Sequence, residues 1–307
     1  MNKRKVKMVV APLLLFFLGA LALPTAQGGT FHCPAQPDNL KIIAFGDSRP
    51  PYHPNKIRLL EAMKKERPDL FLHLGDMVFD SAPEDWQRFD LQEGKLATLD
   101  RPLLPVVGNH EKKTHSVFAD AMVPFFERFP TLEGKPWYEY QCGALRLLVL
   151  SYVHSLKSGA PQREWLEEQV AKEEGDFLLV AIHDPPYTGM PDYPLPEWES
   201  ILSPLFQWAR NHRGVDMVLS GHVHSYERYQ EEGSTFIVSG GGGSYFYTFP
   251  RSSQDLYQGR EPGLHYLRMW INSQELTLEM VAATDSFATS GEMEVLDKVV
   301  LPVRKKP

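Results

Sequence analysis

Cysteine is scarce in this sequence, because its 307 residues include only Cys33 and Cys142. Two cysteines are too few for a fold held together mainly by disulfides. In an oxidising compartment they could form one bond between the N-terminal region and a strand, and the alternative is two separate thiols. The sequence does not give the distance between them, so both alternatives stay open.

Basic residues are also in deficit, with 32 Lys and Arg against 39 Asp and Glu and a formal net charge of -7. Removal of residues 1–28 would take away four basic groups and no acidic ones, so the charge would move from -7 to about -11. We expect no nucleic-acid binding from a chain of this charge, and no attraction to an anionic membrane surface. The sequence does not indicate an oligomeric state.

A stretch long enough to span a membrane is lacking as well. Basic residues within the first seven positions precede an apolar run from Met8 to Leu23, and small residues follow around Ala26 and Gly28. About sixteen apolar residues fall short of the roughly twenty that a spanning helix needs. The pattern favours a cleaved export signal over a retained anchor, and hence a periplasmic or secreted protein without a stable membrane anchor.

No internal repeat or low-complexity linker divides the rest of the chain. Its length fits one large α/β domain. The expected organisation is an export signal peptide at 1–28, an N-terminal extension at 29–39, the main domain at 40–285, and a C-terminal strand and tail at 286–307.

Apolar strands alternate with helical segments through the main domain. This alternation predicts parallel strands joined by crossover helices. The last two strands show an alternating pattern typical of antiparallel strands, which we assign to a second sheet. The predicted fold class is therefore α/β, with two face-to-face β-sheets flanked by helices in a four-layer sandwich. The expected strands are 41–45, 70–74, 103–107, 137–141, 145–150, 177–182, 215–219, 236–238, 264–271 and 275–281, and the helices are 54–66, 83–99, 162–174 and 197–212.

Polar side chains follow five of these strands at the carboxyl end. Ligands bind outside the carboxyl ends of strands in open α/β sheets. A single Gly-Asp or Gly-Asn pair is an ordinary turn signal, but its repetition in register predicts one shared site. In extended backbone His222 and His224 would point to the same side, as two imidazole ligands of a metal would. The motifs are Gly46-Asp47, Gly75-Asp76, Gly108-Asn109-His110-Glu111, Val180 to His183 and Gly221-His222-Val223-His224.

These five motifs, in this order, resemble the calcineurin-like metallophosphoesterase superfamily, and most closely its purple acid phosphatase-like bacterial members. The resemblance covers roughly residues 41–244. It implies an exported hydrolase of small-molecule phosphate esters with two divalent metal ions, Mn, Fe or Zn. Their bridging hydroxide would attack phosphorus, and His110 would assist at the phosphoryl or leaving group. By this resemblance Asp76 would bridge the metals, Asp47 and His224 would bind the first, and Asn109, His183 and His222 would bind the second.

Two positions depart from the family pattern. Arg49 stands where many members have a histidine, and Phe79 stands where the purple enzymes have a tyrosine ligand. The first metal would keep only three of the expected protein ligands and should bind more weakly. We favour Arg49 as a bidentate grip on the substrate phosphate over a surface arginine paired with an acidic neighbour. His53 could substitute as a ligand, although an exposed loop histidine is the favoured interpretation.

Two further questions stay open at the level of sequence. Monoester and diester hydrolysis require the same centre, and the choice of metal is not determined. The alternative from a different functional class is a non-catalytic phospho-ligand binding protein with a decayed first metal site. Loop aromatics that could stack on a substrate ring are Tyr187, Tyr193, Tyr245, Phe246 and Tyr247, and the histidines expected to be structural or solvated are His73, His115, His154, His212 and His265.

Overall fold

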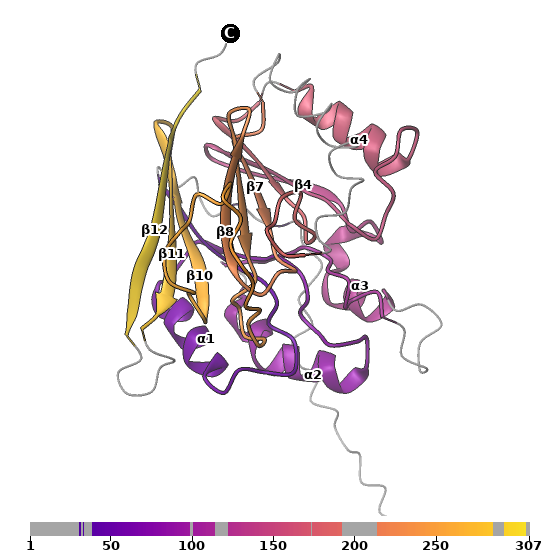
Figure 1. Cartoon of the computed structure of the whole chain (residues 1–307). Coiled ribbons are helices and arrows are strands. Elements are labelled where there is room, and N and C mark those ends of the chain that lie inside the picture. Colours follow the sequence, from indigo (N-terminus) through magenta and orange to yellow (C-terminus); the bar gives the residue numbers. More distant parts are fainter. Residues whose placement is uncertain are drawn as a thin grey trace, which may run out of the picture.

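The computed structural model describes residues 31, 33, 39–98, 101–113, 122–172, 174–191, 214–284 and 292–304 (Figure 1). The expected export signal at 1–28 and the expected helix at 197–212 lie outside these residues. No helix among the described residues is long and apolar enough to cross a membrane.

Two mixed sheets of six strands form the centre of the molecule. The first sheet has the spatial order β12 (Met293–Pro302), β11 (Glu275–Ala283), β10 (His265–Ile271), β1 (Leu40–Phe45), β2 (Leu70–His73), β3 (Leu103–Pro105). The second has the order β4 (Tyr138–Cys142), β5 (Leu145–Val149), β6 (Phe177–Ala181), β7 (Met217–Ser220), β9 (Ser234–Ser239), β8 (Tyr226–Glu231). The predicted fold class is confirmed.

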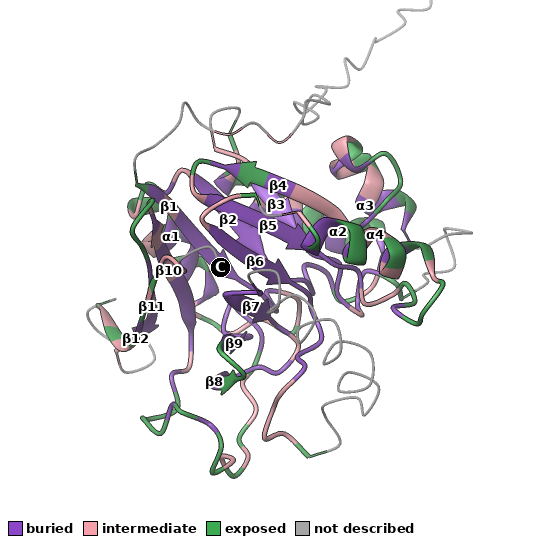
Figure 2. Ribbon diagram, turned by 90° about the horizontal axis from the view of Figure 1, so that it is seen from above, coloured by how far each residue is buried: buried purple, intermediate pink, exposed green. Residues whose placement is uncertain are grey.

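Helices cover the outer face of each sheet. The helices are α1 (Lys56–Lys65), α2 (Pro83–Leu91), α3 (Val123–Arg128) and α4 (Pro161–Val170), with short 3-10 helices at Glu93–Leu96 and Pro130–Leu132. Side chains of α1, α2 and α3 share a buried cluster with the first sheet, and α4 shares another with the second sheet. Figure 2 shows the central strands buried and the helices at the periphery, while the edge strands β8 and β12 carry exposed residues.

The alternation of side chains along a strand explains these layers. On β1, Ile42 and Ala44 belong to the cluster between the two sheets, while Ile43 and Phe45 pack beneath the helices. Successive strand residues point to opposite faces, so a strand that is apolar at every position must be covered on both sides. Each fully buried side chain of this kind contributes about 1.5–3 kcal/mol. The continuous apolar runs therefore position the loops that follow them.

The assignment of strands to sheets differs from the prediction. β10 and β11 do not start a separate sheet, because β10 pairs antiparallel with β1, with Ile42 opposite Met269. The parallel strands are instead divided between the two sheets. The hydrophobic pattern of a strand indicates which of its faces are buried, but it does not indicate which other strand pairs with it. The sequence prediction also missed β8, which forms a hairpin with β9, and α3.

A disulfide joins Cys33 to Cys142, with Cα atoms 5.2 Å apart. This distance lies in the usual range for a disulfide. Phe31 stacks on Tyr138 at the other end of β4, with ring centroids 5.2 Å apart. Of the two alternatives for the cysteines, the paired one is confirmed.

Candidate metal centre

The loops after β1, β2, β3, β6 and β7 meet at the carboxyl ends of the parallel strands and are hydrogen-bonded to one another. Asp47 N donates to Gly75 O at 2.9 Å, and Gly221 N donates to His183 O at 3.0 Å. The second bond links two strands of the second sheet, and the first links two strands of the first sheet. His222 N also donates to Asp47 Oδ2 at 2.8 Å, so the loops of the two sheets are joined into one platform for the polar side chains.

Three side chains expected at the second metal meet at this platform. Asn109 Oδ1 lies 3.1 Å from His183 Nε2 and 3.0 Å from His222 Nδ1. The two ring nitrogens are 3.2 Å apart. His183 Nδ1 lies 2.8 Å from Leu74 O, which can only accept, so that nitrogen carries a proton. Nε2 is the nitrogen that faces the other candidate ligands.

Two side chains expected at the first metal lie beside this group. Asp47 Oδ1 is 3.4 Å from His224 Nε2, while Asp76 Oδ1 is 3.2 Å from His183 Nε2. Asp76 therefore stands next to the second group, and Asp47, Asp76 and His183 each offer one donor atom within 4.8 Å of the others. The structure brings all six predicted ligand side chains to one place.

Buried polar atoms without a hydrogen-bond partner indicate whether these residues could bind a cation. Asp47 Oδ1 and His224 Nε2 are buried and have no hydrogen-bond partner in the described part of the chain. A buried polar atom without a partner is costly. Carboxylate, amide and imidazole donors suit divalent Mn, Fe or Zn. The side chains present therefore fit a divalent metal centre.

Backbone strain is concentrated at the same residues. Asp47 and Asp76 both have φ 58°, and His222 has φ 69°, so three of the six ligand residues are in the left-handed region. Such conformations cost of the order of 1–3 kcal/mol each and persist where the surrounding structure imposes them. The prediction that His222 lies in extended backbone is wrong, because its φ is positive. Both histidine rings nevertheless face the candidate ligands.

Two glycines allow the ligand loops to approach each other closely. A Cβ on Gly108 would lie 2.4 Å from Asp76 Oδ1, and one on Gly75 would lie 2.4 Å from His183 Nδ1. Gly75 also has φ 97°, which side chains rarely tolerate. Gly75 and Gly108 are therefore required by the packing of the site.

Glu111 holds the Asp76 loop in place. Its buried carboxylate accepts N–H bonds from Asp76, Met77 and Val78 at 3.1, 2.7 and 3.3 Å, and from Gly108 at 2.7 Å. Sequence reasoning quoted this residue in a motif without giving it a role. The available signal was the acidic residue that follows Asn109-His110. The motif does not reveal its role, because three of the four backbone groups that Glu111 binds lie about 35 positions away.

The electrostatics of the centre favour positive charge. Burial opposes ionisation of Asp47 and Asp76, but His224 and His183 respectively hold the pKa of each carboxyl below its usual value. Burial lowers the pKa of His183, but the Asp76 carboxylate outweighs this effect and raises it to about 10. Burial lowers the pKa of His222 to about 4, so that ring is neutral near pH 7. Neutral imidazole is the form that binds metals.

His110 faces the same centre from the loop after β3. Its Nδ1 donates to the carbonyl oxygen of Phe79, and its Nε2 lies 3.7 Å from Asp76 Oδ2. Burial lowers the pKa of His110 to about 4. Lys113 Nζ is 2.9 Å from Nε2, a contact that sequence reasoning missed because the lysine belongs to no motif.

Arg49 is neither a free cation at the mouth of the site nor a surface residue. Its Nε donates to Asp76 Oδ2 at 3.0 Å, and its side chain is 11% exposed. Its guanidinium lies 5.9 Å from the centre of the Phe79 ring, and Phe79 is 45% exposed. The arginine therefore pairs with the carboxylate that is expected to bridge both metals.

The other histidines follow their expected roles where they are described. His73 and His265 are fully buried, and His154 packs on Trp137, whereas His115 and His212 lie outside the described residues. His53 accepts from Asn55 N at 3.2 Å and lies among aromatic rings. Among the contacts described for it, none reaches a candidate ligand.

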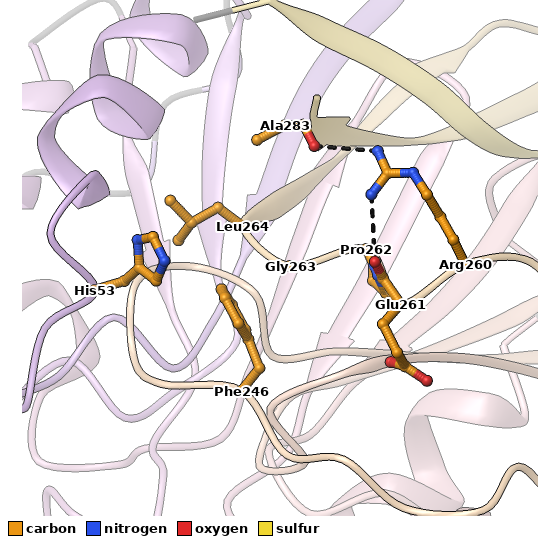
Figure 3. Close-up of a pocket in the computed structure, with 8 residues that line it drawn as sticks. All are labelled: His53, Phe246, Arg260, Glu261, Pro262, Gly263, Leu264 and Ala283. Carbon is orange, nitrogen blue, oxygen red and sulfur yellow. Dashed lines mark hydrogen bonds between the residues drawn. The ribbon is translucent and has the colours of Figure 1, made fainter. Parts of the chain in front are cut away.

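A pocket of about 350 Å³ is lined in part by the segment from Arg260 to Leu264 and by Ala283 (Figure 3). Its lining includes His53 and Phe246, with ring centroids 5.3 Å apart. Tyr247 stacks on His224 at 4.3 Å, and Tyr187 packs on Phe236, so these two tyrosines have structural contacts. Tyr193 lies outside the described residues.

Comparison with known proteins identifies the family. The model of the calcineurin-like phosphoesterases matches residues 40–226. The chain belongs to this family. The match spans β1 to β7, which include the five strands whose loops form the site, and ends at the first residue of β8. The strands β9 to β12 lie beyond the match and belong to the same two sheets.

Relatives of this protein include phosphatases and a phosphodiesterase. A nucleotide pyrophosphatase/phosphodiesterase from Hordeum vulgare is 25% identical and the match covers 87% of this chain and 89% of that protein. An Fe(3+)-Zn(2+) purple acid phosphatase 12 from Arabidopsis thaliana is 27% identical over 60% of this chain and 42% of the relative. The purple acid phosphatase from yellow lupin (Lupinus luteus) seeds shares the fold, with a TM-score of 0.72 at 18% identity over 88% of this chain and 55% of that one. The family and these relatives support a metal-dependent phosphoester hydrolase.

Proposed function

We propose that this protein is an exported phosphoesterase that uses two divalent metal ions to hydrolyse small phosphate esters. The observation that carries the proposal is the convergence of donor atoms from loops far apart in the sequence, two of which are buried without a hydrogen-bond partner among the described residues. The family match and the phosphatase relatives support it.

In this proposal the second cation is held by Asn109, His183 and His222, the first by Asp47 and His224, and Asp76 serves both. When bound, two cations would lower the pKa of the attacking water and neutralise charge on the phosphoryl oxygens. The donor set admits Mn, Fe or Zn, and the Arabidopsis relative carries iron and zinc in its name.

His110 would act on the substrate from the side of Asp76. Its Nδ1 donates to the Phe79 carbonyl, so Nε2 is the atom that would act on the phosphoryl or leaving group, in exchange for its contact with Lys113 Nζ. Arg49 would contribute a guanidinium to the phosphate. Because it is paired with Asp76, it would have to exchange that partner when substrate and metals bind.

The test is a screen of aryl phosphate monoesters and bis-aryl diesters with protein reconstituted separately with Mn²⁺, Fe²⁺ or Zn²⁺. We expect the reconstituted protein to hydrolyse phosphate esters. Asp76→Asn should abolish both this turnover and metal binding. His110→Ala should lower kcat by about 10²- to 10⁴-fold while metal content stays unchanged. Turnover that is equal in metal-free and reconstituted protein would exclude the proposal.

One observation favours the alternative, a phospho-ligand binding protein with a decayed first site. Arg49 occupies Asp76 Oδ2 with an ion pair, as expected if no cation binds there. The same screen separates the two functions. One metal equivalent or none per chain, with phosphate binding but no turnover of any ester, would favour the binding protein.

A further inference from the structure

Asp184 is a buried acid that no family motif includes. It follows His183 directly after β6, and it is 6% exposed. Its Oδ1 is buried and has no hydrogen-bond partner in the described part of the chain. A buried carboxylate oxygen without a partner costs several kcal/mol unless a cation or a donor reaches it. Among the described residues, this oxygen therefore lacks the cation or hydrogen-bond donor that would offset the cost of its burial.

The oxygen lies at the edge of the candidate second metal site. Asp184 Oδ1 is 3.7 Å from His222 Nδ1. Asp184, His183 and His222 each offer one donor atom, and these atoms all lie within 4.8 Å of one another. Pro185 follows Asp184, and a residue before proline is restricted to extended backbone, which limits the directions open to the side chain.

We infer that Asp184 is an additional carboxylate ligand of the second cation. This inference rests on the proposed metal centre but does not require that the protein hydrolyse an ester.

A simple ion pair with His222 does not account for the geometry. A separation of 3.7 Å exceeds the length of a hydrogen bond. The same Nδ1 atom already lies 3.0 Å from Asn109 Oδ1 and 3.2 Å from His183 Nε2. A single ring nitrogen cannot serve all three neighbours through one proton, whereas a cation between them can accept all the lone pairs at once.

An added carboxylate changes which cation the site prefers. The second site would then hold two carboxylates, one amide oxygen and two imidazoles. Oxygen ligands favour Mn²⁺ over softer ions such as Zn²⁺ relative to an imidazole-rich site. We therefore expect the tighter of the two sites to bind Mn²⁺ through Asp184.

The experiment measures Mn²⁺ binding to metal-free protein without substrate, by calorimetry and by the EPR signal of free Mn²⁺. Asp184→Asn keeps the shape and removes the charge. It should weaken the tighter site on the order of tenfold or more, leave the weaker site within twofold, and lower the Mn²⁺ to Zn²⁺ affinity ratio. Asp184→Glu should retain part of the affinity.

Asp216→Asn is the matched control. Asp216 is 2% exposed, accepts from Leu178 N at 2.8 Å and pairs with Arg304, but it precedes β7, at the end opposite His222. The control should bind Mn²⁺ as the wild type does. Asp184→Asn with wild-type affinity in both sites would overturn the inference and leave the proposed function intact. Weaker binding without any turnover in the wild type would support the inference and reject the proposed function. Wild-type protein that binds no Mn²⁺ would reject both.

Discussion

The two candidate metal sites share Asp76 but differ in what surrounds it. At the first site only Asp47 and His224 accompany it, and the Arg49 guanidinium lies 3.0 Å from its Oδ2. At the second, an amide and two imidazoles meet within 3.2 Å of one another, with the buried carboxylate of Asp184 beside them. A cation competes with Arg49 at the first site and gains an extra anion at the second. Cation affinity should therefore be unequal.

Two buried side chains, Glu111 and His73, hold the loops that carry the candidate ligands. Glu111 binds the backbone of the Asp76 and Gly108 loops through its carboxylate. His73 binds the loops beneath the first site, because Gly75 N donates to its Nδ1 at 3.2 Å and its Nε2 lies 2.9 Å from Ser48 Oγ. The Gly75 N–H fixes Nδ1 as an acceptor, so the ring must be neutral. Acid should therefore disturb the loops that carry Asp47 and Asp76.

The strongest test of unequal affinity removes one histidine from each site. His222→Ala should abolish the tight binding of Mn²⁺, with a loss of about 100-fold or more in affinity, because it deletes a direct ligand of the better site. His224→Ala should leave that affinity within a few-fold and remove only the weaker equivalent. Calorimetry and metal analysis measure the loss of Mn²⁺ affinity and of bound metal in each variant. Equal losses in the two variants would contradict the comparison.

A smaller effect is expected from repairing the first site. Arg49→His removes the competing guanidinium and supplies an imidazole, so the weaker site should tighten by about tenfold. Arg49→Gln removes the charge alone and serves as the control, with a smaller gain. Competition with a coloured chelator measures both. If the two variants bind alike, the new histidine is not a ligand.

A separate effect concerns pH and the stability of the fold. Burial lowers the pKa of His73 to about 3, against about 6.5 in the unfolded chain. The unfolded state therefore binds more protons between these values, and the free energy of unfolding should fall by about 1.4 kcal/mol per pH unit as pH drops below 6.5. Urea unfolding of metal-free protein from pH 7 to 4.5 measures this slope, and His73→Gln should reduce it.

His154→Gln is the control for that measurement, because His154 is exposed and its described contacts reach no candidate ligand loop. Its slope should stay close to that of the wild type. An unchanged slope in His73→Gln would show that His73 does not cause the acid sensitivity.

The sequence was a good guide to the side chains that meet at the candidate metal centre and a poor guide to their neighbours. Asp47, Asp76 and His183 could be found because each follows an apolar strand, and the ends of parallel strands meet. Asp184 and Lys113 could not, because their role depends on side chains brought close by folding. Arg49 was recognised as unusual, but its ion pair with Asp76 depends on a loop 27 positions away. The pairing of β10 with β1 was missed for the same reason, since both faces of β1 are apolar.

The bond between Cys33 and Cys142 bears on more than thermal stability. β4 is the outermost strand of its sheet, and the segment at residues 31 and 33 contacts it at both ends. An outer strand with free backbone groups is a template for pairing with another chain. Reduction of the bond would remove one of the two described contacts between this segment and β4, so the attachment of the N-terminal segment to the edge strand depends on the redox state of its surroundings.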